Sequence, residues 1–176
     1  MLSGEQRVSF EELSTPLLRP LYNFARWLTR DTHEAEDLVQ EAFARALKGF
    51  SGFQPGTNFR AWMFRIVRNT FLSSRTNLAV HLSVEEEGED ILLPPDRHTP
   101  ESILMNASLN ERIQSAIERL PVAYREVLLL CDVEEMKYQE IASLVGVPVG
   151  TVMSRISRAR KLLRGMLAED GLRIES

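Results

Sequence analysis

The sequence predicts an all-α protein in which two small helical domains are joined by an acidic, flexible linker. Apolar residues recur about every 3.6 residues over most of the chain, and strand-like alternation never persists for more than a few residues. A chain of 176 residues is long enough for one ordinary domain or two small ones. The pattern is interrupted by a segment with five acids between residues 85 and 90 and three prolines between residues 94 and 100. We therefore expect domains at residues 10–77 and 104–170 and a linker at residues 78–103.

The charge is distributed unevenly along the chain. Residues 1–77 hold ten Lys and Arg against eight Asp and Glu, residues 78–105 hold one against seven, and residues 106–176 hold ten against ten. Residues 43–77 contain six basic residues and no acid, and residues 141–167 contain five and no acid. Solvated helix faces can give this pattern. The net charge of −4 nevertheless does not argue against nucleic-acid binding. Binding to phosphates depends on the charge of the local surface rather than on the sum over the chain.

The amino-terminal domain is predicted to be a bundle of three or four helices, with helices at Thr15–Thr29, Asp31–Lys48 and Phe59–Ser74. The middle helix is the clearest, because Asp31 and Glu34 form a potential capping box and Gly49 can end it. Its buried face is expected to comprise Ala35, Leu38, Val39, Ala42, Phe43, Ala46 and Leu47. The rest of the interior is expected to come from Leu17, Leu21, Phe24, Leu28, Phe64, Ile66, Val67 and Phe71.

The carboxy-terminal domain is predicted to have four helices, at Leu104–Leu120, Ala123–Cys131, Tyr138–Val145 and Val149–Met166. Pro121 stops the first helix, and Gly146 allows a tight turn between the last two. Two short helices with this spacing are typical of a helix-turn-helix. The residues expected between them are Ile141, Ala142, Val145, Val152 and Ile156.

The last helix carries the first set of candidate DNA-binding residues. Its outward face is expected to consist of Thr151, Ser154, Arg155, Arg158 and Lys161, with Ser157 and Arg160 at the edges. Hydroxyl and guanidinium groups can donate to base edges and phosphates in a major groove. A basic amphipathic helix without a ligand is the plainer interpretation, but the adjacent turn and the absence of acids favour DNA binding.

A second set lies where a loop rich in aromatic and amide groups meets a basic helix. It comprises Phe50, Phe53, Asn58, Trp62, Arg65 and Asn69. Aromatic rings beside a basic track suit single-stranded nucleic acid, in which unstacked bases pack on rings. The alternative is that the rings are simply core, which is our interpretation of Phe64 and Phe71.

Asp37, Gln40 and Glu41 form an acidic spot on the polar side of the middle helix. Acids near a helix start are expected from the helix dipole alone, so composition leaves this spot as a solvated face.

Nothing in the sequence indicates catalysis, a cofactor or a metal. His33-Glu34 lacks the second histidine of a zinc-protease helix, and His81 and His98 lie in the linker. Because Cys131 is the single cysteine, the chain cannot form an internal disulfide. Its side chain is expected to be buried and to serve only in packing. No signal peptide or membrane-spanning run is found, which predicts a soluble, cytoplasmic protein without membrane insertion.

Several segments together resemble the extracytoplasmic-function (ECF) sigma factors of the sigma-70 family. They are Glu36–Phe43, Gly56–Asn58, Ala61–Trp62, Arg65–Ile66, Asn69–Phe71, Leu120–Pro121 and Gly150–Arg155. The resemblance covers almost the whole chain outside the linker. It implies that residues 10–77 are sigma region 2 and residues 104–170 are sigma region 4.

The resemblance also implies roles and partners. Asp37, Gln40 and Glu41 would bind the clamp of core RNA polymerase, the aromatic loop with Trp62 and Asn69 would melt the minus-10 promoter element, and the last helix would read the minus-35 duplex. The polymerase flap, promoter DNA and an anti-sigma factor would be further partners. The residues around Gly56 and Asn69 look closest to the thiol-stress branch, whose anti-sigma proteins bind zinc.

Two departures from the family and one alternative function bear on this assignment. Some members have a basic residue in place of Met153, and many have more basic residues after Asn69. A stand-alone helix-turn-helix regulator would also explain the carboxy-terminal domain, but it leaves the aromatic loop and the acidic spot without a function.

Overall fold

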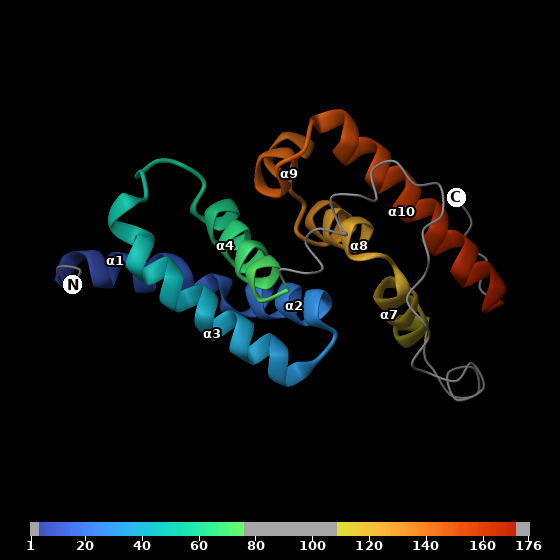
Figure 1. Cartoon of the computed structure of the whole chain (residues 1–176), viewed down its shortest axis with the longest axis horizontal. Coiled ribbons are helices and arrows are strands. Elements are labelled where there is room, and N and C mark those ends of the chain that lie inside the picture. Colours follow the sequence, from blue (N-terminus) through green and yellow to red (C-terminus); the bar gives the residue numbers. More distant parts are fainter. Residues whose placement is uncertain (1–3, 76–108, 172–176) are drawn as a thin grey trace. The chain divides into compact units, whose positions relative to one another are not determined.

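A computed structural model describes residues 4–75 and 109–171 (Figure 1). The predicted linker at residues 78–103 and the predicted helical residues 104–108 lie outside this part. The chain divides into two compact units, and every regular element of the described residues is helical, which confirms the all-α prediction. The amino-terminal unit contains α1 (Gly4–Ser14), η1 (Thr15–Leu17), α2 (Leu18–Thr29), α3 (Thr32–Gly49), η2 (Phe50–Gly52) and α4 (Phe59–Ser74).

Helices α2, α3 and α4 form the core of the amino-terminal unit. On α3 the buried positions are mostly alanines, which let the other two helices approach closely. The core includes Leu21, Phe24, Ala25, Leu28, Ala35, Leu38, Ala42, Ala46, Phe59, Met63, Phe64, Val67 and Phe71. Leu47 was predicted to be inward but is 39% exposed, because it lies about 100° or more around α3 from each of the buried alanines. Leu17, Val39, Phe43 and Ile66, also predicted to be inward, are half-buried.

The predicted cap of α3 is half correct. The Asp31 carboxylate accepts a hydrogen bond from the backbone N–H of Glu34 at 2.9 Å, as expected of an N-cap. The reciprocal bond of a capping box is replaced, since the N–H of Asp31 donates to Thr29 Oγ1 at 3.4 Å and Glu34 accepts from Arg75. Glu34 therefore ties the start of α3 to the end of α4.

Helix α1 was not predicted. One of its side chains, Phe10, is buried, and its ring makes edge-on contacts with Phe43, Phe50 and Phe59 at centroid distances of 5.2–6.4 Å. This ring joins α1 to the aromatic loop that follows α3.

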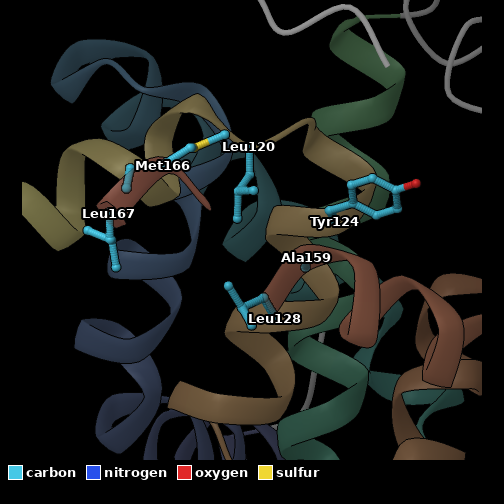
Figure 2. Close-up of a cluster of buried hydrophobic side chains, with 7 residues drawn as sticks. Leu120, Tyr124, Leu128, Ala159, Met166 and Leu167 are labelled. Atoms are coloured by element: carbon cyan, nitrogen blue, oxygen red, sulfur yellow. The ribbon is translucent and has the colours of Figure 1, made fainter. Parts of the chain in front are cut away.

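The carboxy-terminal helices are α7 (Leu109–Arg119), α8 (Val122–Leu128), a π-helical turn η4 (Leu129–Val133), α9 (Tyr138–Val145) and α10 (Val149–Glu169). Their main apolar cluster joins α7, α8 and α10 (Figure 2). It consists of Ala116, Leu120, Tyr124, Leu128, Ala159, Met166 and Leu167. An ion pair from Arg119 to Asp170, at 2.8 Å, links the end of α7 to the end of α10.

Arg125 is buried in the carboxy-terminal unit, with 1% of its surface exposed. Its guanidinium donates to the backbone oxygens of Glu118 and Leu120, at 2.8 and 3.3 Å. These carbonyls lie at the end of α7, where the helix itself supplies no donors. Arg125 therefore fixes the corner between α7 and α8.

The predicted helix-turn-helix is formed by α9 and α10. Gly146 has φ +79°, a left-handed conformation that favours glycine, and the N–H of Val147 donates to the carbonyl of Ala142 at 3.2 Å. All five residues predicted to lie between the helices are buried: Ile141, Ala142, Val145, Val152 and Ile156. The turn thereby fixes how α10 presents its outward face.

Candidate nucleic-acid interface

The outward face of α10 is polar and basic. Ser154, Ser157, Arg158 and Lys161 are exposed, and Thr151 is half-buried. Arg164 is exposed on the same face; sequence reasoning missed it, although its spacing from Ser157 and Lys161 could have identified it. The helix has no acid before Glu169, so this face attracts phosphates.

Arg155 was predicted to be outward, and this prediction is wrong. It is only 9% exposed. At about 100° per residue, Arg155 lies between the exposed Arg158 and the fully buried Val152, about 60° from each, and within about 40° of the fully buried Ala159. Its contact with DNA stays a prediction, made from a position with little exposed surface.

Arg160 lies at the edge of the outward face, as predicted, and it has a partner within the protein. Its guanidinium donates to both carboxylate oxygens of Asp132, at 2.6 and 3.3 Å. These hydrogen bonds raise the pKa of Arg160 above its already high ordinary value. The two side chains are about 40% exposed, so the pair contributes at most about 1 kcal/mol. It links α10 to the end of η4.

Three residues of the second candidate set share one face of α4. Trp62, Arg65 and Asn69 are spaced by three and four residues, and none of them belongs to the buried stripe of the helix. Arg65 and Asn69 are exposed, and Trp62 is half-buried. This face combines a ring, a guanidinium and an amide, which can stack on a base, pair with a phosphate and read a base edge.

The aromatic loop packs its rings against one another. Phe50 and Phe53 are stacked at 5.9 Å, and Trp62 contacts Phe53 at 5.1 Å and Phe59 at 5.6 Å. Phe59 is buried, whereas the other three rings are half-buried. Each of those three therefore contributes to the core and also exposes part of its surface.

A pocket of about 520 Å³ opens beside this loop, which is within the usual size range of ligand sites. Its lining includes Phe50, Phe53, Gly56, Thr57 and Phe59. Thr57 Oγ1 donates to the carbonyl of Gln54 at 2.7 Å, and Gly56 has φ +88°, so the loop is an ordered turn.

Asn58 is exposed, but its side chain already has a role within the protein. Its Oδ1 accepts from the N–H of Ala61 at 3.1 Å and caps α4. The predicted contact of Asn58 with bases stays a prediction.

The acidic spot on α3 is exposed and extends further than predicted. Asp37 and Glu41 line a pocket of about 490 Å³ together with Glu34, which shares their face, and Arg75. Glu41 also pairs with Arg45 at 2.9 Å. Gln40 is also exposed, about 60° around α3 from Asp37. The surface is suited to a basic protein segment.

The remaining predictions concern the single cysteine, metal binding and membrane insertion. Cys131 is half-buried, and desolvation together with Asp132 raises the pKa of its thiol, which disfavours the reactive thiolate. Within residues 4–75 and 109–171, no group of three or more His, Cys, Asp and Glu side chains could hold a metal ion. No helix of the described residues is both long and apolar enough to cross a membrane.

These features define a class: a helical protein with a helix-turn-helix in one unit and an aromatic, basic surface in the other. The family described as Sigma-70 region 2 matches residues 13–79, and that described as Sigma-70 region 4 matches residues 110–163. Together these matches span more than half of the chain.

Individual relatives agree with the family matches. The chain is 37% identical to the ECF RNA polymerase sigma factor SigE of Mycolicibacterium smegmatis over 170 residues, which cover 95% of this chain and 65% of that protein. It is 35% identical to the ECF sigma factor EcfG of Rhodopseudomonas palustris, with 84% of this chain and 79% of that protein covered. The structure resembles the sigma factor RpoE of Bartonella quintana, solved with the anti-sigma factor NepR, with a TM-score of 0.70, 26% identity and coverage of 91% and 97%. The chain belongs to the ECF sigma factors of the sigma-70 family.

Proposed function

We propose that this sigma factor binds core RNA polymerase in the cytoplasm and directs it to promoters that contain a minus-35 and a minus-10 element. One observation carries the proposal: the two units present different nucleic-acid surfaces, a helix-turn-helix for duplex and an aromatic, basic surface for unstacked bases. A stand-alone regulator needs only the first surface. Its role is that of an initiation factor rather than an enzyme.

The minus-35 element would be read by α10. Arg158 and Lys161 supply charge for phosphates, while Ser154 and Ser157 are short enough for the helix to approach the base edges. Thr151 and Arg160 would contact DNA from the edges of this face, and Arg155 would act mainly by supporting the helix.

The minus-10 element would be opened and held by the amino-terminal unit. Trp62, Phe50 and Phe53 would provide stacking surfaces, and Arg65 and Asn69 would hold the strand beside them. Each stacked base contributes on the order of 1–3 kcal/mol, enough to offset the local cost of unpairing. Asn58, at the start of α4, would lie beside the bound strand.

The partner of the acidic face on α3 would be a basic part of the polymerase clamp, bound through Asp37, Gln40 and Glu41, while the flap would bind region 4. An anti-sigma factor would occupy these surfaces in the inhibited state; the similar Bartonella sigma factor was solved in complex with the anti-sigma factor NepR. Zinc binding by that partner, and membership of the thiol-stress branch, stay predictions.

Two experiments test this assignment. Asp37→Ala with Gln40→Ala should weaken binding to core polymerase at least tenfold in an anisotropy titration, whereas Glu12→Ala, which removes an exposed acid from α1, should have no effect. Arg65→Ala with Asn69→Ala should lower the permanganate reactivity of minus-10 thymines while holoenzyme still occupies the promoter. Unchanged binding and unchanged melting in these variants would contradict the assigned surfaces.

A further inference from the structure

Met153 interrupts the polar outward face of α10 with a long apolar side chain. It is 51% exposed, and it is the one large hydrophobic residue that is exposed on this helix. The helix begins at Val149, so Met153 lies in its second turn, one turn before Ser157 on the same side. Nothing within the fold requires an apolar group at this position.

The residues around Met153 on the outward face are small. Gly150, Ser154 and Ser157 are exposed and lie near the middle of the outward arc. A side chain added at Gly150 would meet no other atom within 4 Å, and this glycine does not have a positive φ. Glycine destabilises a helix relative to alanine, and neither packing nor backbone conformation requires it here. A close approach by an external surface would account for it.

The major groove offers one apolar feature that a methionine can recognise, the C5-methyl group of thymine. In helix-turn-helix proteins, residues near the start of the second helix contact base edges. We propose that Met153 is a specificity-determining residue that selects thymine at one position of the upstream element through this methyl group. The inference rests on the proposed function and extends it to a single base.

The proposal makes a quantitative prediction that involves one methyl group. Replacing a thymidine of the promoter by deoxyuridine removes only the C5-methyl group and leaves the base pairing intact. Burial of one methyl group corresponds to about a fourfold change in the dissociation constant. The slope of log affinity against log salt should be unchanged by Met153→Ala, because an apolar contact releases no counterions.

The test begins with run-off transcription by the holoenzyme to define a promoter, followed by single thymine-to-deoxyuridine substitutions across its upstream element. With the wild-type protein, one substitution should weaken holoenzyme binding about fourfold. Met153→Ala should reduce this penalty to less than twofold, and Met153→Leu should retain it. Val133→Ala, which alters another exposed apolar residue of the carboxy-terminal unit, should leave it unchanged.

The outcomes separate the two proposals. If transcription occurs but no thymine shows a penalty that depends on Met153, the role of Met153 is wrong and the sigma function stands. If no promoter responds although the protein is folded, both proposals are wrong. A penalty that disappears only in Met153→Ala supports the contact.

Discussion

Replacing Leu120 with alanine should destabilise the carboxy-terminal unit selectively. Leu120 is fully buried in the cluster that joins α7, α8 and α10. The substitution removes three carbon atoms, which corresponds to about 2.4 kcal/mol of lost transfer free energy. The residual cavity brings the expected loss in the free energy of unfolding to about 3 kcal/mol. A unit of about 60 residues is stabilised by only about 3–9 kcal/mol, so the variant should be partly unfolded near physiological temperature.

The assay uses the placement of the tryptophans. Both of them, Trp27 and Trp62, lie in the amino-terminal unit. In urea denaturation of Leu120→Ala, circular dichroism should show an early loss of helix, while the tryptophan fluorescence transition should keep its midpoint. Leu21→Ala, at a fully buried position of the other unit, is the matched control and should shift the fluorescence transition instead. A fluorescence midpoint that moves as far in Leu120→Ala as in Leu21→Ala would refute the division into separately stabilised units.

Three further predictions concern caps and charge. Asn58→Ala should lower the stability of the amino-terminal unit by about 1 kcal/mol in urea denaturation, and Asn58→Ser should restore most of it. The backbone N–H of Glu34 lowers the pKa of Asp31, so the stability from this cap is present above the ordinary aspartate pKa and is lost as the pH falls through the lowered value. Asp31→Asn should abolish that part of the pH dependence in thermal melts; a retained dependence would contradict the cap. In holoenzyme binding to promoter DNA, Arg158→Ala and Lys161→Ala should each reduce the salt slope by about one, whereas Arg160→Ala should change it less. Equal slopes for all three variants would contradict the outward face.

Periodicity predicted the parts of the fold that depend on local pattern. The buried face of α3 was predictable because Ala35, Leu38 and Ala42 repeat at spacings of three and four, and Asp31 marks the start of the helix. The helix-turn-helix was predictable because Gly146 marks the turn. Helix α1 gave no such signal, because Phe10 packs against rings from distant segments, and spacing along one helix does not reveal such contacts.

The candidate site was harder to predict at polar residues whose place in the fold gives them contacts within the protein. Arg155 looked outward because arginine is usually exposed, yet its angle on α10 places it at the edge of the buried stripe. The partner of Arg160 is Asp132, 28 residues earlier in the sequence, and spacing on one helix cannot reveal such a pair. Asn58 was assigned to the loop and to DNA contact, although the predicted helix start at Phe59 already placed it at the N-cap position.

The central claim is that this chain directs initiation by RNA polymerase. The most direct measurement is run-off transcription with purified bacterial core polymerase and a library of genomic fragments, with and without the protein, followed by sequencing of the transcript starts. The account predicts discrete starts that appear only with the protein and share two upstream elements. An absence of new starts, from a protein that is folded and binds DNA without polymerase, would contradict it and favour a stand-alone regulator.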